Sequence, residues 1–167
     1  MKPHLRFDRV TCRRGGRVLF EDLELQVGPG DALHPPGPTG SGKSSLIRLA
    51  AGLLRAESGR IDRSALALAA EHIALDRELA PGRELGFWGG EVDRAMDALD
   101  LARLADVPVR LLSTGQARRA TLARVAASEA PLWLLDEPLN ALDADGVARL
   151  DAVVAAHRAA GGAVLAA

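Results

Sequence analysis

The chain has 167 residues, of which 48% are hydrophobic and 26% are charged, and its formal net charge is −1. These values predict one globular domain with its own core, and they exclude intrinsic disorder and a protein that binds nucleic acid or anionic lipid mainly by charge. The apolar runs are far shorter than the ~20 residues that span a bilayer, and the first residues lack the apolar stretch of a secretory signal. Cys12 is the only cysteine, so no internal disulfide can form and a reducing, cytosolic compartment fits best.

The first part of the chain is predicted to form strands. Residues 23–27 alternate apolar and polar side chains, which is typical of a strand with one buried face, and the Gly-Pro-Gly sequence at 28–30 ends it. Residues 31–34 are a second, short strand candidate. Because prolines 35 and 36 cannot donate to a sheet, either this strand stops early or the entry to the following loop is distorted.

Three further elements are expected before residue 70. Apolar residues recur at helical spacing over 43–54 and predict a helix there. Residues 57–60 favour a turn. Residues 65–69 are a weak strand candidate, and a helix fits them nearly as well.

Residues 76–112 are interpreted as a small helical insert. Glycine and proline interrupt 81–90, and apolar residues then recur at helical spacing over 92–102. Another helix is expected after residue 115, so the helical subdomain is predicted over approximately 76–125.

The last part returns to strand, helix and strand. Residues 132–135 form a continuous apolar run, which is typical of a strand buried on both faces. Asp145 is expected to cap the next helix, two glycines at 161–162 to end it, and residues 163–167 to begin a further strand. Alternating strands and helices predict an α/β fold with a mainly parallel sheet.

The segment Gly-Pro-Thr-Gly-Ser-Gly-Lys-Ser at 37–44 matches the phosphate-binding loop pattern G-x-x-x-x-G-K-[ST]. Glycines let the backbone N–H groups approach a phosphate closely, and the following helix N-terminus attracts its negative charge. Lys43 can reach the β- and γ-phosphates, and the Ser44 hydroxyl can ligate Mg²⁺. The alternative, a glycine-rich turn with a solvated lysine, is disfavoured because strand, loop and helix follow in the required order.

Two carboxylates, Asp136 and Glu137, follow the apolar run at 132–135. A rigid buried strand can hold Asp136 beside Mg²⁺, and Glu137 can polarise a water that attacks the γ-phosphate. Alone, this pattern could mark only a strand that leaves the core. The phosphate-loop pattern upstream favours the catalytic interpretation.

The sequence Leu-Ser-Thr-Gly-Gln at 112–116 resembles the LSGGQ signature of ABC transporter ATPases, with Thr114 in place of the first glycine. Residues 141–143 resemble the family's D-loop, so the resemblance spans 37–143. It implies a P-loop NTPase fold of the ABC ATPase type, with a mainly parallel sheet core, N-terminal antiparallel strands and a small helical insert. The whole chain, 1–167, would be one ATP-binding domain.

The resemblance also implies partners and a mechanism. Two cassettes would pair head to tail with two ATP molecules between them, and Ser113 and Gly115 would clamp the γ-phosphate held by the other chain's loop. An integral membrane subunit would supply the pore, with this chain bound peripherally at the cytoplasmic face of the inner membrane. No nucleic acid is expected as a partner.

Together, these motifs predict a set of site residues for Mg²⁺ and ATP. Catalysis is assigned to Lys43, Asp136 and Glu137, and Mg²⁺ binding to Ser44 and Asp136. The residues assigned to ATP are Gly37, Pro38, Thr39, Gly40, Ser41, Gly42, Lys43, Ser44, Ser45, Ser113, Gly115 and Gln116.

Within the family, segments 115–119, 136–143 and 145–147, together with Cys12-Arg13, resemble the ATP-binding export proteins of cytochrome c biogenesis, the ATPase subunits of haem exporters. The function implied is ATP hydrolysis coupled to haem export. Two alternatives stay open: a soluble ABC ATPase that acts as a mechanical or regulatory switch, and a nucleotide-binding module that is inactive as it stands.

Three features depart from the family pattern. The Q-loop glutamine is expected near residue 72, where this chain has His72, and the adenine-stacking aromatic is expected near Cys12 or Arg13, neither of which is aromatic. The switch histidine follows the strand that begins at Ala163, so we expect the chain to be truncated just before it. His157 lies on the preceding helix and is no substitute.

Overall fold

The computed structural model describes residues 2–38, 40–70 and 75–167. The chain divides into two compact units. The first contains residues 1–68, 130–136 and 158–167, and the second contains residues 69–129 and 137–157.

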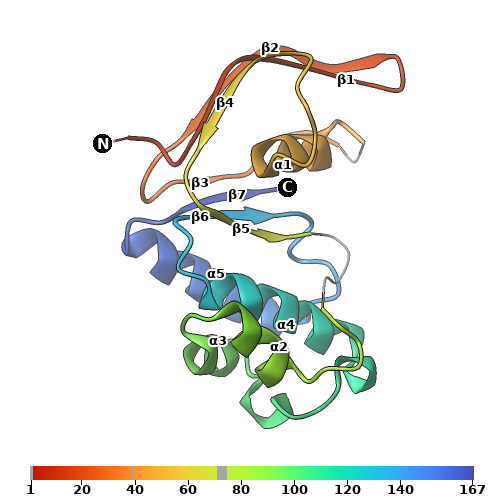
Figure 1. The fold of residues 1–167 in the computed structure, drawn as a ribbon, viewed down its shortest axis with the longest axis vertical. Helices are drawn as coiled ribbons and strands as arrows, with labels where there is room; N and C mark the ends of the chain where they lie inside the picture. Colours follow the sequence, from red (N-terminus) through yellow and green to blue (C-terminus); the bar gives the residue numbers. More distant parts are fainter. Residues whose placement is uncertain (1, 39, 71–74) are drawn as a thin grey trace. The chain divides into compact units, whose positions relative to one another are not determined.

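The first unit contains an antiparallel sheet of three strands, β1 (Leu5–Arg14), β2 (Arg17–Val27) and β4 (Ser58–Arg63), in the order β2-β1-β4 (Figure 1). Gly15 and Gly16, with φ of 55° and 76°, form the two-residue turn between β1 and β2. Positive φ at both positions suits a hairpin turn whose twist matches its strands. The N-terminal antiparallel strands are confirmed, and β2 is longer than the predicted 23–27.

The turn predicted at 57–60 is wrong for most of its length. Ser58 begins β4 and pairs with Thr11, and the Glu57 N–H donates to the Thr11 carbonyl (2.9 Å). Gly59, with φ 86°, lies where a side chain would collide with the Arg9 carbonyl oxygen. The glycine thus serves a close approach between two strands, and the sheet pairing overrides the local turn preference.

The first unit also contains a second sheet of β3 (Ala32–Leu33), β7 (Ala163–Ala166), β6 (Leu132–Leu135) and β5 (Leu66–Ala69), in the order β3-β7-β6-β5. The pairs β3–β7 and β6–β7 are parallel, which confirms the predicted α/β fold, and the weak candidate at 65–69 is a strand. Because β3 ends at Leu33, the strand before the two prolines stops early.

Helix α1 (Lys43–Ala51) lies between the two sheets of the first unit (Figure 1). Its apolar side chains join one buried cluster with both sheets, and each buried leucine contributes roughly 1.5–3 kcal/mol. The helix ends three residues before the predicted limit because Gly52, with φ 77°, adopts the left-handed C-terminal conformation. The largest members of the cluster are Leu5, Phe7, Leu46, Ile47, Leu49, Leu132, Leu134 and Leu165.

The second unit is helical, as predicted for the insert. It contains α2 (Pro81–Trp88), α3 (Val92–Ala98) and α4 (Thr114–Ala127), which pack on one another (Figure 1). Two short 3-10 helices, η1 (Ala102–Leu104) and η2 (Val109–Leu111), and most of α5 (Ala144–Ala159) complete it. Among the helices in the described part of the chain, none has the length and apolar character needed to cross a bilayer.

Helix α5 is capped by Asp143 rather than by the predicted Asp145. The Asp143 Oδ1 atom accepts a hydrogen bond from the Gly146 N–H (2.8 Å), which is the usual geometry of an N-cap three residues earlier. Asp145 lies in the first turn of the helix and pairs with Arg149 (2.6 Å). The helix begins at Ala144, two residues earlier than a cap at Asp145 would require, and the cap moves by the same two residues.

Candidate functional site

The loop between β3 and α1 ends in an open helix N-terminus. Gly42 is the N-cap of α1 with φ 103°, no side chain caps the helix among the described residues, and its first turn carries no acidic residue. The first N–H groups of a helix have no partner within the helix and carry its positive dipole end. This end of α1 is therefore suited to an anion. Thr39, within the loop, lies outside the described residues.

The loop also has a place that only glycine can occupy. Gly37 has φ 136°, and a Cβ atom there would lie 2.8 Å from the Ser41 Oγ atom. That hydroxyl is buried and has no hydrogen-bond partner within the described residues. A buried hydroxyl without a partner costs free energy. An acceptor that enters the loop, such as a phosphate oxygen, would remove this cost.

Lys43 places its charge at the start of the same loop. Its ammonium group donates to the carbonyl oxygen of Gly37, six residues earlier in the chain. The lysine side chain therefore spans the loop 37–44, from its second-last residue to its first. A positive charge in this position complements an anion bound by the loop N–H groups.

Ser44 and Asp136 come together from segments 92 residues apart. The Ser44 hydroxyl, on α1, donates to the Asp136 Oδ1 atom (2.9 Å), which follows the buried strand β6. The Asp136 side chain is buried, with the residue only 3% exposed. A hydroxyl oxygen and a carboxylate are the hard ligands that Mg²⁺ prefers, and the ion typically takes them together with phosphate oxygens and water. The pair thus fits the metal site that the sequence predicts.

Glu137 belongs to the second unit, and its backbone is unusual. It has φ 49°, a left-handed conformation that costs a residue other than glycine about 1–3 kcal/mol. The Glu137 carbonyl accepts the Asn140 N–H (3.2 Å), so residues 137–140 form a turn with Pro138 in its second position. Strained backbone of this kind is often found where a side chain has to be held in one direction.

The signature segment forms the N-terminus of α4 through a capping box. The Ser113 Oγ atom accepts the Gln116 N–H (3.2 Å), and the Gln116 Oε1 atom accepts the Ser113 N–H (2.9 Å). The pattern S-x-x-Q before a helix is a known sequence signal for this arrangement, although the capping box was not among the features predicted above. Ser113 and Gln116, two of the residues predicted to bind ATP, therefore also order the helix end.

Gly115 joins the signature to the D-loop candidate within the second unit. A Cβ atom at Gly115 would lie 2.8 Å from the Ala141 carbonyl oxygen, closer than side chains approach in practice. Ala141 itself has φ 65°. The glycine is thus needed for a close backbone approach between the start of α4 and residues 137–143.

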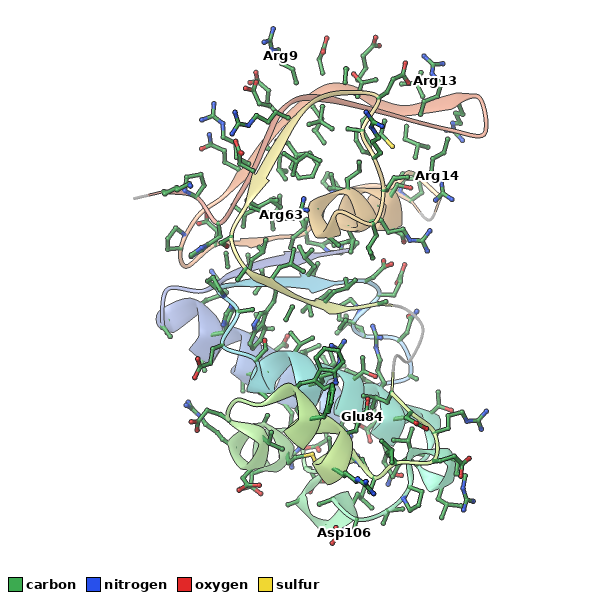
Figure 2. The ribbon with its side chains drawn as sticks, viewed as in Figure 1. Arg9, Arg13, Arg14, Arg63, Glu84 and Asp106 are labelled. Carbon is green, nitrogen blue, oxygen red and sulfur yellow. The ribbon has the colours of Figure 1, made fainter. Side chains whose placement is uncertain are left out.

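Of the positions that depart from the family pattern, the structure describes Cys12 and Arg13 but not His72. Residues 71–74, which include His72, lie outside the described residues. Cys12 is a core residue, and its burial raises the pKa of the thiol above the ordinary value. Arg13 is exposed (Figure 2) and forms an ion pair with Glu57 (3.0 Å). Neither side chain offers an aromatic ring to a base.

Comparison with known proteins places these features in a common context. Residues 20–140 match the family described as ABC transporter. The chain is 57% identical to the cytochrome c biogenesis ATP-binding export protein CcmA of Sphingopyxis alaskensis, over 96% of this chain and 87% of that protein. It is 46% identical to the protein of the same name from Rhodospirillum rubrum, over 93% and 76%.

Solved structures show the same fold at lower identity. An ATP-binding subunit of an ABC transporter superposes with a TM-score of 0.88 at 22% identity, covering 97% of this chain and 78% of that one. An ATP-binding cassette of an ABC transporter in its ADP conformation gives a TM-score of 0.81 at 19% identity, with coverage of 99% and 81%.

Proposed function

This chain belongs to the ABC transporter family, among its cytochrome c biogenesis ATP-binding export proteins, and we propose that it hydrolyses ATP to drive haem export. The observation that carries the proposal is the hydrogen bond between Ser44 and Asp136 beside the uncapped N-terminus of α1. The anion site and the Ser44 hydroxyl lie on one helix, and Asp136 adds its carboxylate from the end of β6. This combination is what a magnesium nucleotide requires.

The loop 37–44 binds the phosphates of ATP in this proposal. The α1 N–H groups and the Lys43 ammonium would hold the β- and γ-phosphate oxygens, and the Ser41 hydroxyl would gain an acceptor. Ser44 and Asp136 would hold Mg²⁺, which supplies charge neutralisation at the phosphates when bound. Asp136 is fixed in place because β6 is buried on both faces.

Glu137 is the general base of the proposed reaction. It would take a proton from the water that attacks the γ-phosphate, so that the bond from that phosphorus to the bridging oxygen breaks and ADP leaves. The signature residues Ser113 and Gly115 would act on the nucleotide of a second cassette, with the N-terminus of α4 directed at its γ-phosphate. Hydrolysis then removes the group that joins the two chains.

The transported compound passes through a membrane partner in this proposal, and the chain acts at the cytoplasmic face of the inner membrane. Two exposed aromatic residues at the end of α2, Phe87 and Trp88, support a protein contact in the second unit. Their rings meet edge to face (5.6 Å between centroids). Large aromatic side chains that stay exposed often mark an interaction surface.

Replacing Lys43 with alanine is expected to weaken ATP binding at least tenfold in the presence of Mg²⁺, which corresponds to about 1.4 kcal/mol. The variant loses the charge at the start of the loop, while the α1 N-terminus stays in place. Equilibrium titration with a fluorescent ATP analogue measures the change. Lys2→Ala, at the only other lysine and exposed, is the matched control. Equal affinity of the two variants would rule out the phosphate-loop assignment.

A further inference from the structure

Arg118 is a buried arginine that bonds to two backbone carbonyls. The residue is 3% exposed and lies one turn into α4, two positions after the signature. Its guanidinium donates to the Ala70 carbonyl (2.6 Å) and to the Glu137 carbonyl (2.7 Å), all within the second unit. Hydrogen bonds from a charged donor are about twice as strong as those between neutral groups. The planar fork of arginine suits two acceptors at once.

The bond to Glu137 acts on a residue whose backbone is strained. The Glu137 carbonyl also accepts the Asn140 N–H, so one oxygen joins the turn and the arginine. Because this carbonyl and the Glu137 carboxylate extend from the same Cα atom, rotation of the backbone there would redirect the carboxylate. The φ of 49° has to be maintained by its surroundings, and the Arg118 bond is a direct way to do so.

The same arginine connects this turn to the signature helix. Arg118 and Gly115 are both on α4, and Gly115 packs closely on Ala141 of the segment 137–143. Two contacts therefore join α4, whose N-cap is Ser113, to the segment that begins at Glu137. Glu137 serves the nucleotide in its own chain, whereas Ser113 serves the partner's, under the function proposed above.

We propose that Arg118 is a positioning residue that holds the backbone of Glu137, and so aims the base at the ATP bound by the same chain. This inference rests on the proposed function. It assigns Arg118 to the hydrolysis step in its own chain rather than to the signature contact across the dimer. A residue on α4 could act on Glu137 of its own chain or on the signature contact with the partner's nucleotide, and the proposal assigns Arg118 to the first of these.

Arg118→Met keeps the aliphatic stem and removes all N–H donors. In the full-length protein we expect kcat for ATP to fall at least tenfold, with ATP affinity changed by less than twofold because the loop 37–44 is untouched. Arg119→Met is the matched control, since Arg119 is the next residue of the same helix and bonds to the Leu99 carbonyl (3.2 Å) instead. Wild-type turnover in Arg118→Met, or an equal loss in both variants, would overturn the proposal. If Arg118→Met folds poorly, Arg118→Gln replaces it: its shorter, neutral side chain removes the charge and the two-donor fork, and Arg119→Gln is then the control.

Mixed dimers separate the two possible roles. Each ATP site of the proposed dimer consists of the phosphate loop of one chain and the signature of the other. In a dimer of one Ser113→Arg chain and one Lys43→Ala chain, both substitutions fall in the same site. The second site is then intact, and ATPase activity returns through it. We expect Arg118→Met to regain activity when mixed with Ser113→Arg and not when mixed with Lys43→Ala, because its lesion stays with its own phosphate loop. Recovery with Lys43→Ala instead would overturn the proposal and assign Arg118 to the signature. If the reference pair itself stays inactive, the shared sites of the proposed function fail, and the kcat comparison with Arg119→Met still decides the role of Arg118.

Discussion

Glu137→Gln is expected to lower ATP turnover by about 10²-fold or more while ATP binding persists. The amide keeps the shape of the side chain and loses the ability to take a proton from water. The binding groups of the loop 37–44, Lys43 among them, are unchanged by the substitution. Phosphate release at saturating ATP measures the loss, and equilibrium titration with ATP shows that binding is retained.

Glu129→Gln is the control for this comparison. Glu129 is exposed and lies in the link between α4 and β6, so the same chemical change there should leave turnover as in the wild type. If Glu137→Gln also turned over ATP at the wild-type rate, Glu137 would not be the base, and a different group would have to activate the water.

Ser113→Arg is expected to abolish ATP-dependent pairing of two chains while each chain still binds ATP. The change removes the acceptor for the Gln116 N–H, which costs about 1 kcal/mol of helix stability, and it places a bulky cation at the positive end of α4. The fitted donors for the partner's γ-phosphate are thereby lost. Sedimentation velocity with Mg²⁺ and ATP measures the pairing, and a titration with ATP measures binding by the single chain.

A second arginine variant distinguishes position from charge. Ser128→Arg adds the same cation at the C-cap of α4, where the helix dipole favours it. We expect this variant to pair as the wild type does. If Ser113→Arg still pairs normally, or if both variants fail alike, the signature does not contact nucleotide in the way proposed.

Much of the fold could be predicted because its signals are local. The apolar run at 132–135 coincides with β6, and the glycine-rich loop precedes α1 as expected. The long hairpin of β1 and β2 was predicted only in part, since irregular register in β1 breaks the alternation that marks a strand. The first half of the edge strand β4 was interpreted as a turn because its residues are mostly polar and its partners in β1 are 47 to 58 residues away in sequence.

In the candidate site, too, the features marked by local motifs could be predicted, and those that depend on tertiary contacts could not. The Ser44–Asp136 pair followed from two recognisable motifs, and the structure brings them within hydrogen-bond distance. The role of Arg118 could not be predicted, because its two acceptors are backbone carbonyls that only the tertiary structure brings together. The capping box of Ser113 and Gln116, in contrast, was present in the sequence as a four-residue pattern.

The most direct test of whether ATP joins two cassettes is to measure whether the Glu137→Gln variant is a monomer or a dimer in solution. Sedimentation velocity of the full-length variant should give a dimer with Mg²⁺ and ATP, and a monomer with ADP or without Mg²⁺, because only unhydrolysed ATP joins the phosphate loop of one chain to the signature of the other. A monomer under all three conditions, or a dimer that forms regardless of nucleotide, would contradict this account.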